Sequence, residues 1–139
     1  MDRISWDDYF LEIAKVVSKR STCLRRQYGA VIVKDNNIIS TGYNGSPMGE
    51  PNCCDIGYCE RELRQIPAGE RYELCRAVHA EQNAIIKASS ADMHGATIYI
   101  AGTNVKDGTP ASGKPCLLCA RMIKNAKLTR IVYEGSIMP

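Results

Sequence analysis

No apolar stretch in these 139 residues approaches the roughly 20 residues that a membrane-spanning helix requires. The first ten residues, MDRISWDDYF, are acidic and amphipathic, and they lack the basic start and apolar centre of a secretory signal. The net charge is only +3 at pH 7, without a stripe of Lys and Arg, which suits an anionic small molecule better than nucleic acid. We therefore expect a cytoplasmic protein that binds neither membrane nor nucleic acid.

The chain also shows no internal repeat, low-complexity tract or linker, which favours a single domain over residues 1–139. Apolar periodicity predicts a helix that begins behind Ser5 and ends near Arg20. Further patterns predict strands at 28–33, 38–42, 96–101 and 129–133, and helices at 60–65, 80–88 and 115–125. A short turn makes the first two strands antiparallel, and a crossover helix makes the last two parallel. The expected fold is α/β, with three α/β/α layers and a mixed sheet of four to five strands.

The seven cysteines are an odd number and a high count for this length. Without a secretion signal, they argue against a disulfide framework and for metal ligands or reactive thiols. Cys116 and Cys119 follow Pro115 as Pro-Cys-x-x-Cys, and proline is typical of the first turn of a helix. Such a pair, taken alone, is compatible with a zinc site, a redox dithiol or chance.

His79 and Glu81 decide between these alternatives, although a histidine at this position could by itself be only a helix cap. His79, Cys116 and Cys119 together supply three ligands of a tetrahedral zinc ion and leave its fourth position to water. Glu81 then remains as a carboxylate that need not bind the metal. The pattern H-x-E followed by P-C-x-x-C is the signature of zinc-dependent deaminases of nucleobases.

The chain resembles the cytidine and deoxycytidylate deaminases over nearly its whole length, and most closely the deoxycytidylate branch. The resemblance is carried by His79-Ala-Glu-Gln-Asn-Ala-Ile85, Gly42-Tyr-Asn-Gly-Ser-Pro47 and Gly29-Ala-Val-Ile32. It implies a cytidine-deaminase-like fold, one catalytic zinc ion and the hydrolytic deamination of dCMP to dUMP and ammonia. In this chemistry Glu81 is the general acid and base.

Three further residues are candidates for binding the nucleotide. Asn44 could be only a turn residue, but the resemblance implies that it contacts the sugar. Arg25 and Arg26 precede the first predicted strand. Either they belong to the solvated surface, or one of them binds the 5′-phosphate with the bidentate geometry that Arg offers.

Four of the remaining cysteines, Cys23, Cys53, Cys59 and Cys75, could hold a second, structural zinc ion. Some deoxycytidylate deaminases contain such a zinc, and the resemblance matches Cys23 and Cys53 to two of its ligands. Cys59 and Cys75 would replace histidines there. The alternatives are free, buried thiols, or Cys54 in place of its neighbour Cys53.

Two departures from the family bear on substrate and assembly. Residues 103–114 form an insertion before Pro115, and this insertion could act as a lid over the active site. The sequence ends at Pro139, where relatives add a helix and a strand, so the sheet edge could be open to a partner. Because the family commonly forms dimers or hexamers, we expect a homo-oligomer.

Two other functions remain open at this point. The same chemistry could act on another cytosine nucleotide, a nucleoside or a tRNA base. Alternatively, the chain could be a non-catalytic binding module that zinc stabilises, although such a module has no use for the carboxylate of Glu81.

Overall fold

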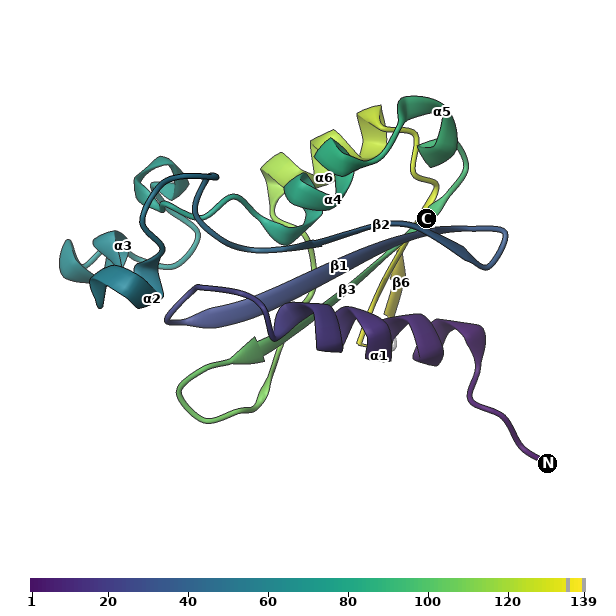
Figure 1. Cartoon of the computed structure of the whole chain (residues 1–139), viewed down its shortest axis with the longest axis horizontal. Helices are drawn as coiled ribbons and strands as arrows, with labels where there is room; N and C mark the ends of the chain where they lie inside the picture. The colour runs from purple at the N-terminus through teal and green to yellow at the C-terminus, as the bar shows by residue number, and fades with distance from the viewer. Residues whose placement is uncertain (135, 139) are drawn as a thin grey trace.

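The computed structural model describes residues 1–134 and 136–138. Its centre is a six-stranded sheet in the order β2-β1-β3-β5-β6, and β4 pairs with β3 beyond the end of β5 (Figure 1). The strands are β1 (Arg26–Lys34), β2 (Asn37–Tyr43), β3 (Thr97–Asn104), β4 (Pro110–Ala111), β5 (Arg130–Tyr133) and β6 (Ser136–Met138). The helices are α1 (Trp6–Ser18), α2 (Cys53–Ile56), α3 (Glu60–Leu63), α4 (Ala80–Lys87), α5 (Ser90–Met93) and α6 (Leu117–Asn125), with a 3-10 turn, η1 (Tyr72–Leu74).

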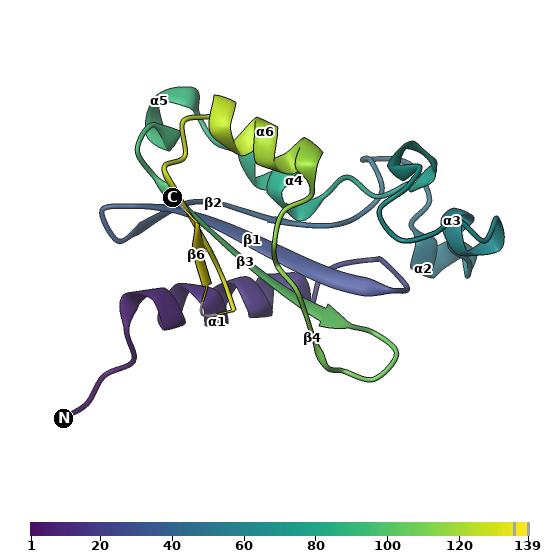
Figure 2. The same cartoon turned by 180° about the vertical axis from the view of Figure 1, so that it is seen from behind.

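Helices cover both faces of this sheet, so the predicted α/β/α layering is confirmed (Figures 1 and 2). Side chains alternate between the two faces along a strand. In β1, Val31 and Val33 pack on the α1 side with Phe10. Ala30 and Ile32 pack on the other side, in the core that α4 and α6 share. The two apolar clusters therefore lie on opposite faces of one sheet.

The first two strands form the predicted antiparallel hairpin. Asp35 and Asn36 stand at its turn with φ of 51° and 61°. Two consecutive residues with positive φ are typical of the tight turns whose twist matches that of a hairpin, and Asp and Asn tolerate this conformation. The turn is thus two residues long, within the predicted segment 34–37.

The parallel pairing of the third and fourth predicted strands is also confirmed. Thr97 is in register with Arg130 and Ile100 with Tyr133. The helix between these strands is α6, which crosses over the face that α4 also covers (Figure 2). This crossover places the beginning of α6 near the end of the sheet where β3 passes into β4.

The sheet has two more strands than the four that the sequence patterns located. β4 is two residues long and folds back on β3, and β6 is three residues long and pairs antiparallel with β5. Elements this short carry too few alternating positions to be recognised by periodicity. Because β6 covers β5, the edge that the sequence left open is paired within the chain.

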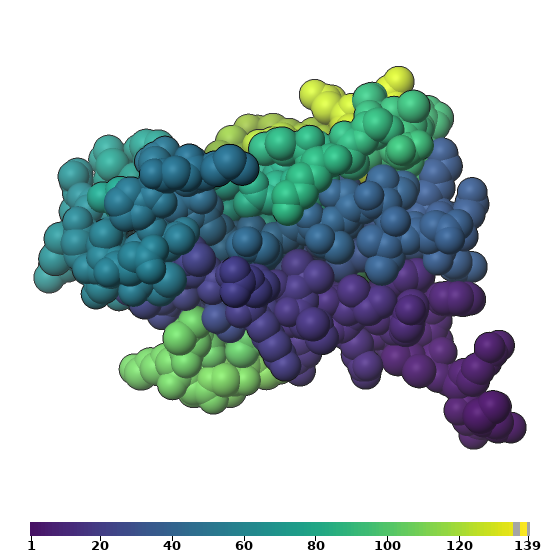
Figure 3. Space-filling view, in the orientation of Figure 1, coloured from purple at the N-terminus to yellow at the C-terminus, as the bar shows by residue number. Residues whose placement is uncertain are grey.

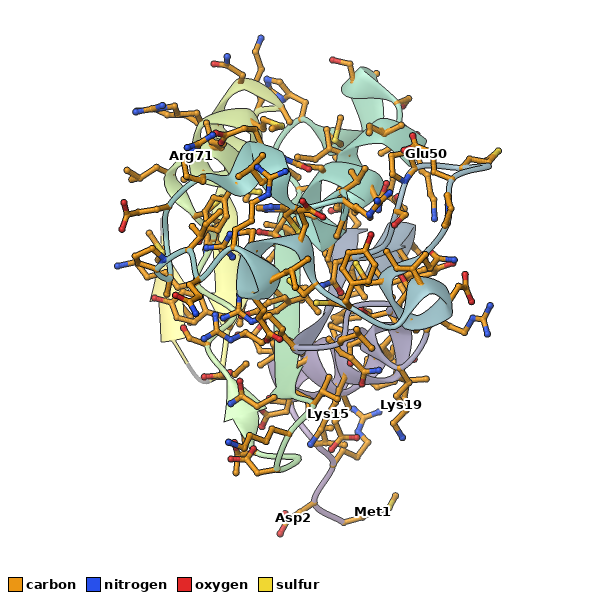
Figure 4. All side chains as sticks on the ribbon, turned by 90° about the vertical axis from the view of Figure 1, so that its left-hand side faces the viewer. Met1, Asp2, Lys15, Lys19, Glu50 and Arg71 are labelled. Carbon is orange, nitrogen blue, oxygen red and sulfur yellow. The ribbon has the colours of Figure 1, made fainter. Side chains whose placement is uncertain are left out.

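Residues 46–78 gather at one end of the sheet and contain α2, α3 and η1 (Figures 1 and 3). The predicted helix near Glu60 is present and ends at Leu63. Figure 4 looks onto this end of the molecule, with Glu50 and Arg71 at its opposite margins. Among the described residues, no helix has the length and apolar character needed to cross a membrane.

Candidate active site and metal centre

The site begins where α4 starts, against the sheet. His79 is the N-cap of α4, which puts Glu81 in the first turn, where it is buried with 7% of its surface exposed. The helix can approach β2 closely because position 42 is a glycine. A Cβ on Gly42 would lie 2.4 Å from both the Ala80 carbonyl oxygen and the Ala84 nitrogen. The absence of a side chain at Gly42 therefore fixes the place of His79 and Glu81 relative to the sheet.

The second part of the site is the beginning of α6. Cys116 has extended backbone dihedrals and is the N-cap, and its sulfur accepts a hydrogen bond from the Cys119 N–H at 3.4 Å. The expectation that Pro115 opens the first helical turn is therefore wrong, because Pro115 lies before the cap and the helix begins at Leu117. The physical reason is that the sulfur of Cys116 itself satisfies one of the unpaired N–H groups of the helix start.

The structure brings the three predicted zinc ligands together. The Nδ1 atom of His79 lies 3.2 Å from Sγ of Cys119 and 3.7 Å from Sγ of Cys116. A tetrahedral zinc ion, with bonds of about 2.0 Å to nitrogen and about 2.3 Å to sulfur, holds such atoms roughly 3.6 Å apart. These three residues form the one group of possible metal ligands found within 4.8 Å of one another among residues 1–134 and 136–138. The donor set and its spacing thus fit zinc.

Charges within the site influence one another strongly. Burial raises the pKa of the Glu81 carboxyl, although its own backbone and the His79 imidazole act in the opposite direction. Burial also raises the pKa of the Cys119 thiol, and the neighbouring Glu81 carboxyl and Cys116 sulfur raise it further. A divalent cation would favour the thiolates, because a coordinating thiol loses its proton.

A pocket of about 160 Å³ opens beside these ligands. Glu81, His79 and Cys116 line it on the metal side. Four cationic side chains also line it, namely Arg25, Arg26, Arg61 and Lys114. The pocket therefore joins a potential Lewis-acid centre to a positively charged wall, which suits a small anionic substrate.

Asn44 lines the pocket, but most of its amide group is engaged with the backbone of β1. Its Oδ1 accepts a hydrogen bond from the Tyr28 N–H at 2.8 Å, and its Nδ2 donates to the Arg26 carbonyl at 2.9 Å. Asn44 is not among the residues with positive φ, so it does not adopt the left-handed conformation that asparagine tolerates in turns. It fastens the end of β2 to the beginning of β1, at the pocket wall.

The two candidate arginines occupy different environments. Arg25 forms an ion pair with Glu62, with 2.9 Å between Nε and Oε1. Arg26 is exposed at the pocket and forms no ion pair within the part of the chain that is described. The structure therefore distinguishes the two candidates, because Arg25 has an ion-pair partner and Arg26 has none among the described residues.

The four cysteines of the predicted second metal site lie in one region of the 46–78 segment and its surroundings. Burial raises the pKa of the Cys53 thiol, and the nearness of Cys23, Cys75 and Cys59 raises it further. Their sulfur atoms are farther apart than 4.8 Å as a set, and all four are free thiols. The cysteines are thus neighbours without the spacing of a closed tetrahedral site.

Residues 103–114 form a ribbon and not a cover over the pocket. Its turn is closed by hydrogen bonds from Gly108 N–H to Asn104 O and from Asn104 N–H to Thr109 O. The ribbon extends beyond the sheet on the side that carries α1, whereas α4 and α6 lie on the other side (Figures 1 and 2). Of this segment, Gly113 and Lys114 reach the pocket lining.

Several pocket residues could not be identified from the sequence. Tyr28, Arg61 and Tyr72 belong to the pocket wall, and the Tyr72 ring meets the His79 ring edge-on at 5.6 Å between centroids. Arg61 lies in Glu60–Arg64, a charged stretch that resembles a solvated helix face. Tyr28 alone carries a local hint, because it adjoins the strand motif beginning at Gly29.

Known proteins are similar to this chain over most of its length. Residues 4–135 match the cytidine and deoxycytidylate deaminase zinc-binding region. The deoxycytidylate deaminase of Mycobacterium phage D29 is 38% identical over 138 residues, which cover 96% of this chain and 97% of that protein. The deoxycytidylate deaminase of Schizosaccharomyces pombe is 36% identical over 134 residues, but this chain spans only 38% of its length.

A solved structure agrees with these sequence relatives. The dCMP deaminase from the cyanophage S-TIM5 superposes with a TM-score of 0.63 at 25% identity, over 94% of this chain and 82% of that one. By its zinc-binding signature, its fold and its relatives, the chain belongs to the cytidine and deoxycytidylate deaminase family.

Proposed function

We propose that this protein is a dCMP aminohydrolase, which converts dCMP and water into dUMP and ammonia. One observation carries the proposal: the buried carboxylate of Glu81 lies beside three zinc ligands at the base of a pocket with cationic walls. Two relatives, 36% and 38% identical to this chain, are deoxycytidylate deaminases, and one of them has almost the length of this chain. The positively charged wall supports a nucleotide in preference to an uncharged nucleoside.

His79, Cys116 and Cys119 would hold the zinc ion. When bound, zinc acts as a Lewis acid and lowers the pKa of a coordinated water towards neutrality. The three side chains come from the starts of two helices, whose positive dipole ends partly offset the negative charge of two thiolates. In this way the protein positions a metal without filling its fourth ligand position.

Glu81 moves the protons of the reaction. Its carboxylate accepts a proton from the attacking water and delivers it to ring N3 of the pyrimidine while the new bond to C4 forms. It then takes the remaining proton from the hydroxyl now attached to C4 and transfers it to the amino group, so that the C4 carbonyl forms as the C4–N4 bond breaks and ammonia leaves. The carboxylate thus ends in the state in which it began, and one water is consumed for each ammonia released.

The remaining pocket residues orient the nucleotide. Arg26, which forms no ion pair among the described residues, is a better candidate for contact with the 5′-phosphate than Arg25, which pairs with Glu62. Asn44 can still offer one amide N–H to the sugar, because a side-chain amide has two such donors and one is used on Arg26. Lys114 adds a further cation at the mouth of the pocket.

A panel of substrates tests this proposal. Ammonia release is measured with dCMP, CMP, deoxycytidine, cytidine and guanine on zinc-loaded protein. We expect dCMP to give the highest kcat/KM. A higher value for another compound would move the proposal to that substrate. No turnover on any of them, with zinc fully bound, would favour a binding module without catalytic activity.

A second, structural zinc ion at Cys23, Cys53, Cys59 and Cys75 remains part of the proposal. Its support is that Cys23, Cys59 and Cys75 line one pocket, and that burial and the other three thiols raise the pKa of Cys53. Binding would require the sulfurs to draw together. We expect zinc content near two per chain, falling to one in Cys59→Ser. A content of one per chain that survives this substitution would remove the second zinc from the account.

We also propose a cytoplasmic homo-oligomer. Support comes from apolar side chains exposed on the outer surfaces of α4 and α6, with Ile86 at 72% and Leu117 at 75% exposure. Such side chains lose contact with water when copies of the chain associate. Sedimentation of the purified protein distinguishes a dimer or hexamer from a monomer.

A further inference from the structure

Arg61 is a buried cation that forms no ion pair with any described residue. Only 6% of its surface is exposed, although a guanidinium keeps its charge at all ordinary pH values. Its Nε donates to the Glu70 carbonyl at 3.1 Å and its Nη2 to the Pro67 carbonyl at 2.9 Å. Neither carbonyl neutralises the charge, and the ion pairs of the described chain do not include Arg61. Burying such a charge without an anion is costly, so its presence calls for a ligand that compensates it.

The guanidinium has unused donors where a ligand could reach them. A guanidinium carries five N–H groups, and the two carbonyls take only part of this set. Within residues 1–134 and 136–138, Nη1 has no hydrogen-bond partner, and it is not among the enclosed atoms that lack one. Arg61 is also part of the pocket lining. Nη1 is therefore an accessible, unused donor on a side chain that lines the pocket.

Tyr72 connects this charge to the metal site. The Arg61 Cζ atom lies 4.9 Å from the centre of the Tyr72 ring, in a cation–π arrangement. The same ring contacts His79 edge-on, with 5.6 Å between centroids. Arg61 and the zinc ligand His79 are thus separated by about one aromatic ring. In a nucleotide, one sugar similarly separates the reacting base from the 5′-phosphate.

Arg61 is also the most rigidly held cation of the pocket. Arg26 and Lys114 are exposed side chains, and Arg25 is paired with Glu62. Two carbonyls and an aromatic ring hold Arg61 from three directions. A cation that is already ordered loses little conformational freedom when it binds an anion, which favours affinity and selectivity.

We propose that Arg61 binds the 5′-phosphate of the substrate and thereby selects a nucleotide over a nucleoside. This inference rests on the proposed deamination of dCMP. The phosphate supplies the negative charge that the buried guanidinium lacks, through charge-assisted hydrogen bonds from its unused donors. Arg26 and Lys114 close the outer side of the phosphate, where the pocket meets solvent. Arg61 is a binding residue and takes no part in proton transfer.

The test compares paired ligands that differ only in the phosphate. In Arg61→Met, which keeps much of the side-chain stem, we expect the Kd for dUMP measured by calorimetry to rise roughly 10- to 100-fold. The Kd for deoxyuridine should stay unchanged, and kcat/KM for dCMP should fall by the same factor as dUMP binding. Arg61→Lys keeps a charge without the planar donor set, and should show a smaller loss.

The matched control is Arg64→Met at the C-cap of the same short helix, where Arg64 is exposed and pairs with Glu60. It should leave both Kd values unchanged, with zinc content equal to wild type in every variant. Equal losses for dUMP and deoxyuridine in Arg61→Met would show that Arg61 only supports the 67–70 loop, and would overturn the inference. Unchanged dUMP binding would overturn it as well. A wild-type protein that binds dUMP but does not deaminate dCMP would instead refute the proposed function.

Discussion

The side-chain oxygen of Asn44 accepts a hydrogen bond from the backbone N–H of Tyr28 at 2.8 Å, across 16 positions of sequence. Its amide nitrogen donates to the Arg26 carbonyl at 2.9 Å. Asn44 itself is 7% exposed, so these contacts are shielded from water. The residue that the family resemblance assigns to the substrate is therefore also a structural fastener of the pocket wall.

Replacing Asn44 should consequently affect stability as well as substrate binding. In Asn44→Ala, one N–H and one carbonyl of β1 lose their partners, and we expect the free energy of unfolding to fall by about 2 kcal/mol. Urea unfolding of the zinc-loaded protein measures this change. Asn37→Ala, which removes an exposed turn contact to the Asp35 carbonyl, is the control and should cost far less. Full stability in Asn44→Ala, with weakened dUMP binding, would mean that its role is confined to the substrate.

The close approach of β2 to α4 leads to a second prediction. A methyl group on Gly42 would meet backbone atoms of Ala80 and Ala84 at 2.4 Å, and backbone cannot move aside as a flexible side chain can. In Gly42→Ala we expect α4 to be displaced, at a cost of about 1–3 kcal/mol in the free energy of unfolding. The displacement should carry His79 out of place, so zinc should be lost to a chelator sooner than from wild type.

Gly45→Ala is the matched control for this substitution. The added methyl group would lie 3.2 Å from the hydroxyl oxygen of Thr22, a side-chain atom that can shift by a few tenths of an ångström. Zinc retention and stability should stay close to those of wild type. Similar losses in both variants would show that any bulk near the pocket is harmful, and that the contact between β2 and α4 is not special.

An ion pair on the opposite face of the sheet gives a prediction for pH dependence. Asp7 accepts a hydrogen bond from the Tyr99 hydroxyl at 2.7 Å, and its Oδ1 lies 2.9 Å from Nη1 of Arg130. The Arg130 guanidinium lowers the pKa of the Asp7 carboxyl below 3.8. A carboxyl group whose pKa is lower in the folded than in the unfolded chain stabilises the folded state at pH values above its unfolded-state pKa. This stabilisation is lost as the pH falls through the pKa of the folded state.

We therefore expect Asp7→Asn to lower the free energy of unfolding at pH 7 by about 1 kcal/mol, since the pair is partly exposed. The difference from wild type should shrink as the pH falls below 3.8. Denaturant unfolding of both proteins at pH 7, 5 and 3 checks this, with Asp8→Asn as a neighbour that forms no ion pair in the described chain. A difference of the same size at pH 3 and pH 7 would contradict an electrostatic origin.

The contacts among Asp7, Tyr99 and Arg130 also affect the stability of the folded chain at alkaline pH. Burial and the Asp7 carboxylate together raise the pKa of Tyr99 to about 12. Because this pKa is higher than that of an unfolded tyrosine, its contribution to stability is present below the unfolded value of 10.0 and is lost as pH rises through about 12.

The parts of the structure that could be predicted are those with a local pattern. The zinc ligands were found because His79-x-Glu81 and Pro115-Cys-x-x-Cys119 each lie within one short segment. The α/β/α layering could be predicted from the spacing of apolar residues in α1, β1 and β3, because these elements are long enough for the spacing to be recognised. In both cases the information lies within a few consecutive residues.

The parts that could not be predicted depend on contacts between distant segments. The structural role of Asn44 depends on its hydrogen bonds to the backbone of β1. The position of Arg61 at the pocket wall depends on its contacts with the carbonyls of Pro67 and Glu70 and with the Tyr72 ring. β4 and β6 exist because β3 and β5 offer them a partner, since neither has the length to form a strand alone. Sequence patterns do not report such pairings.

We assign proton transfer to Glu81, beside a zinc ion that His79, Cys116 and Cys119 would hold. Glu81→Gln removes the proton acceptor but preserves the size of the side chain. The direct measurement is the rate of dUMP formation from dCMP by this variant, with zinc content and dUMP affinity determined on the same sample. We predict wild-type zinc content and dUMP binding, with kcat lower by roughly 10²- to 10⁴-fold. A zinc-loaded Glu81→Gln protein that forms dUMP at nearly the wild-type rate would contradict the account.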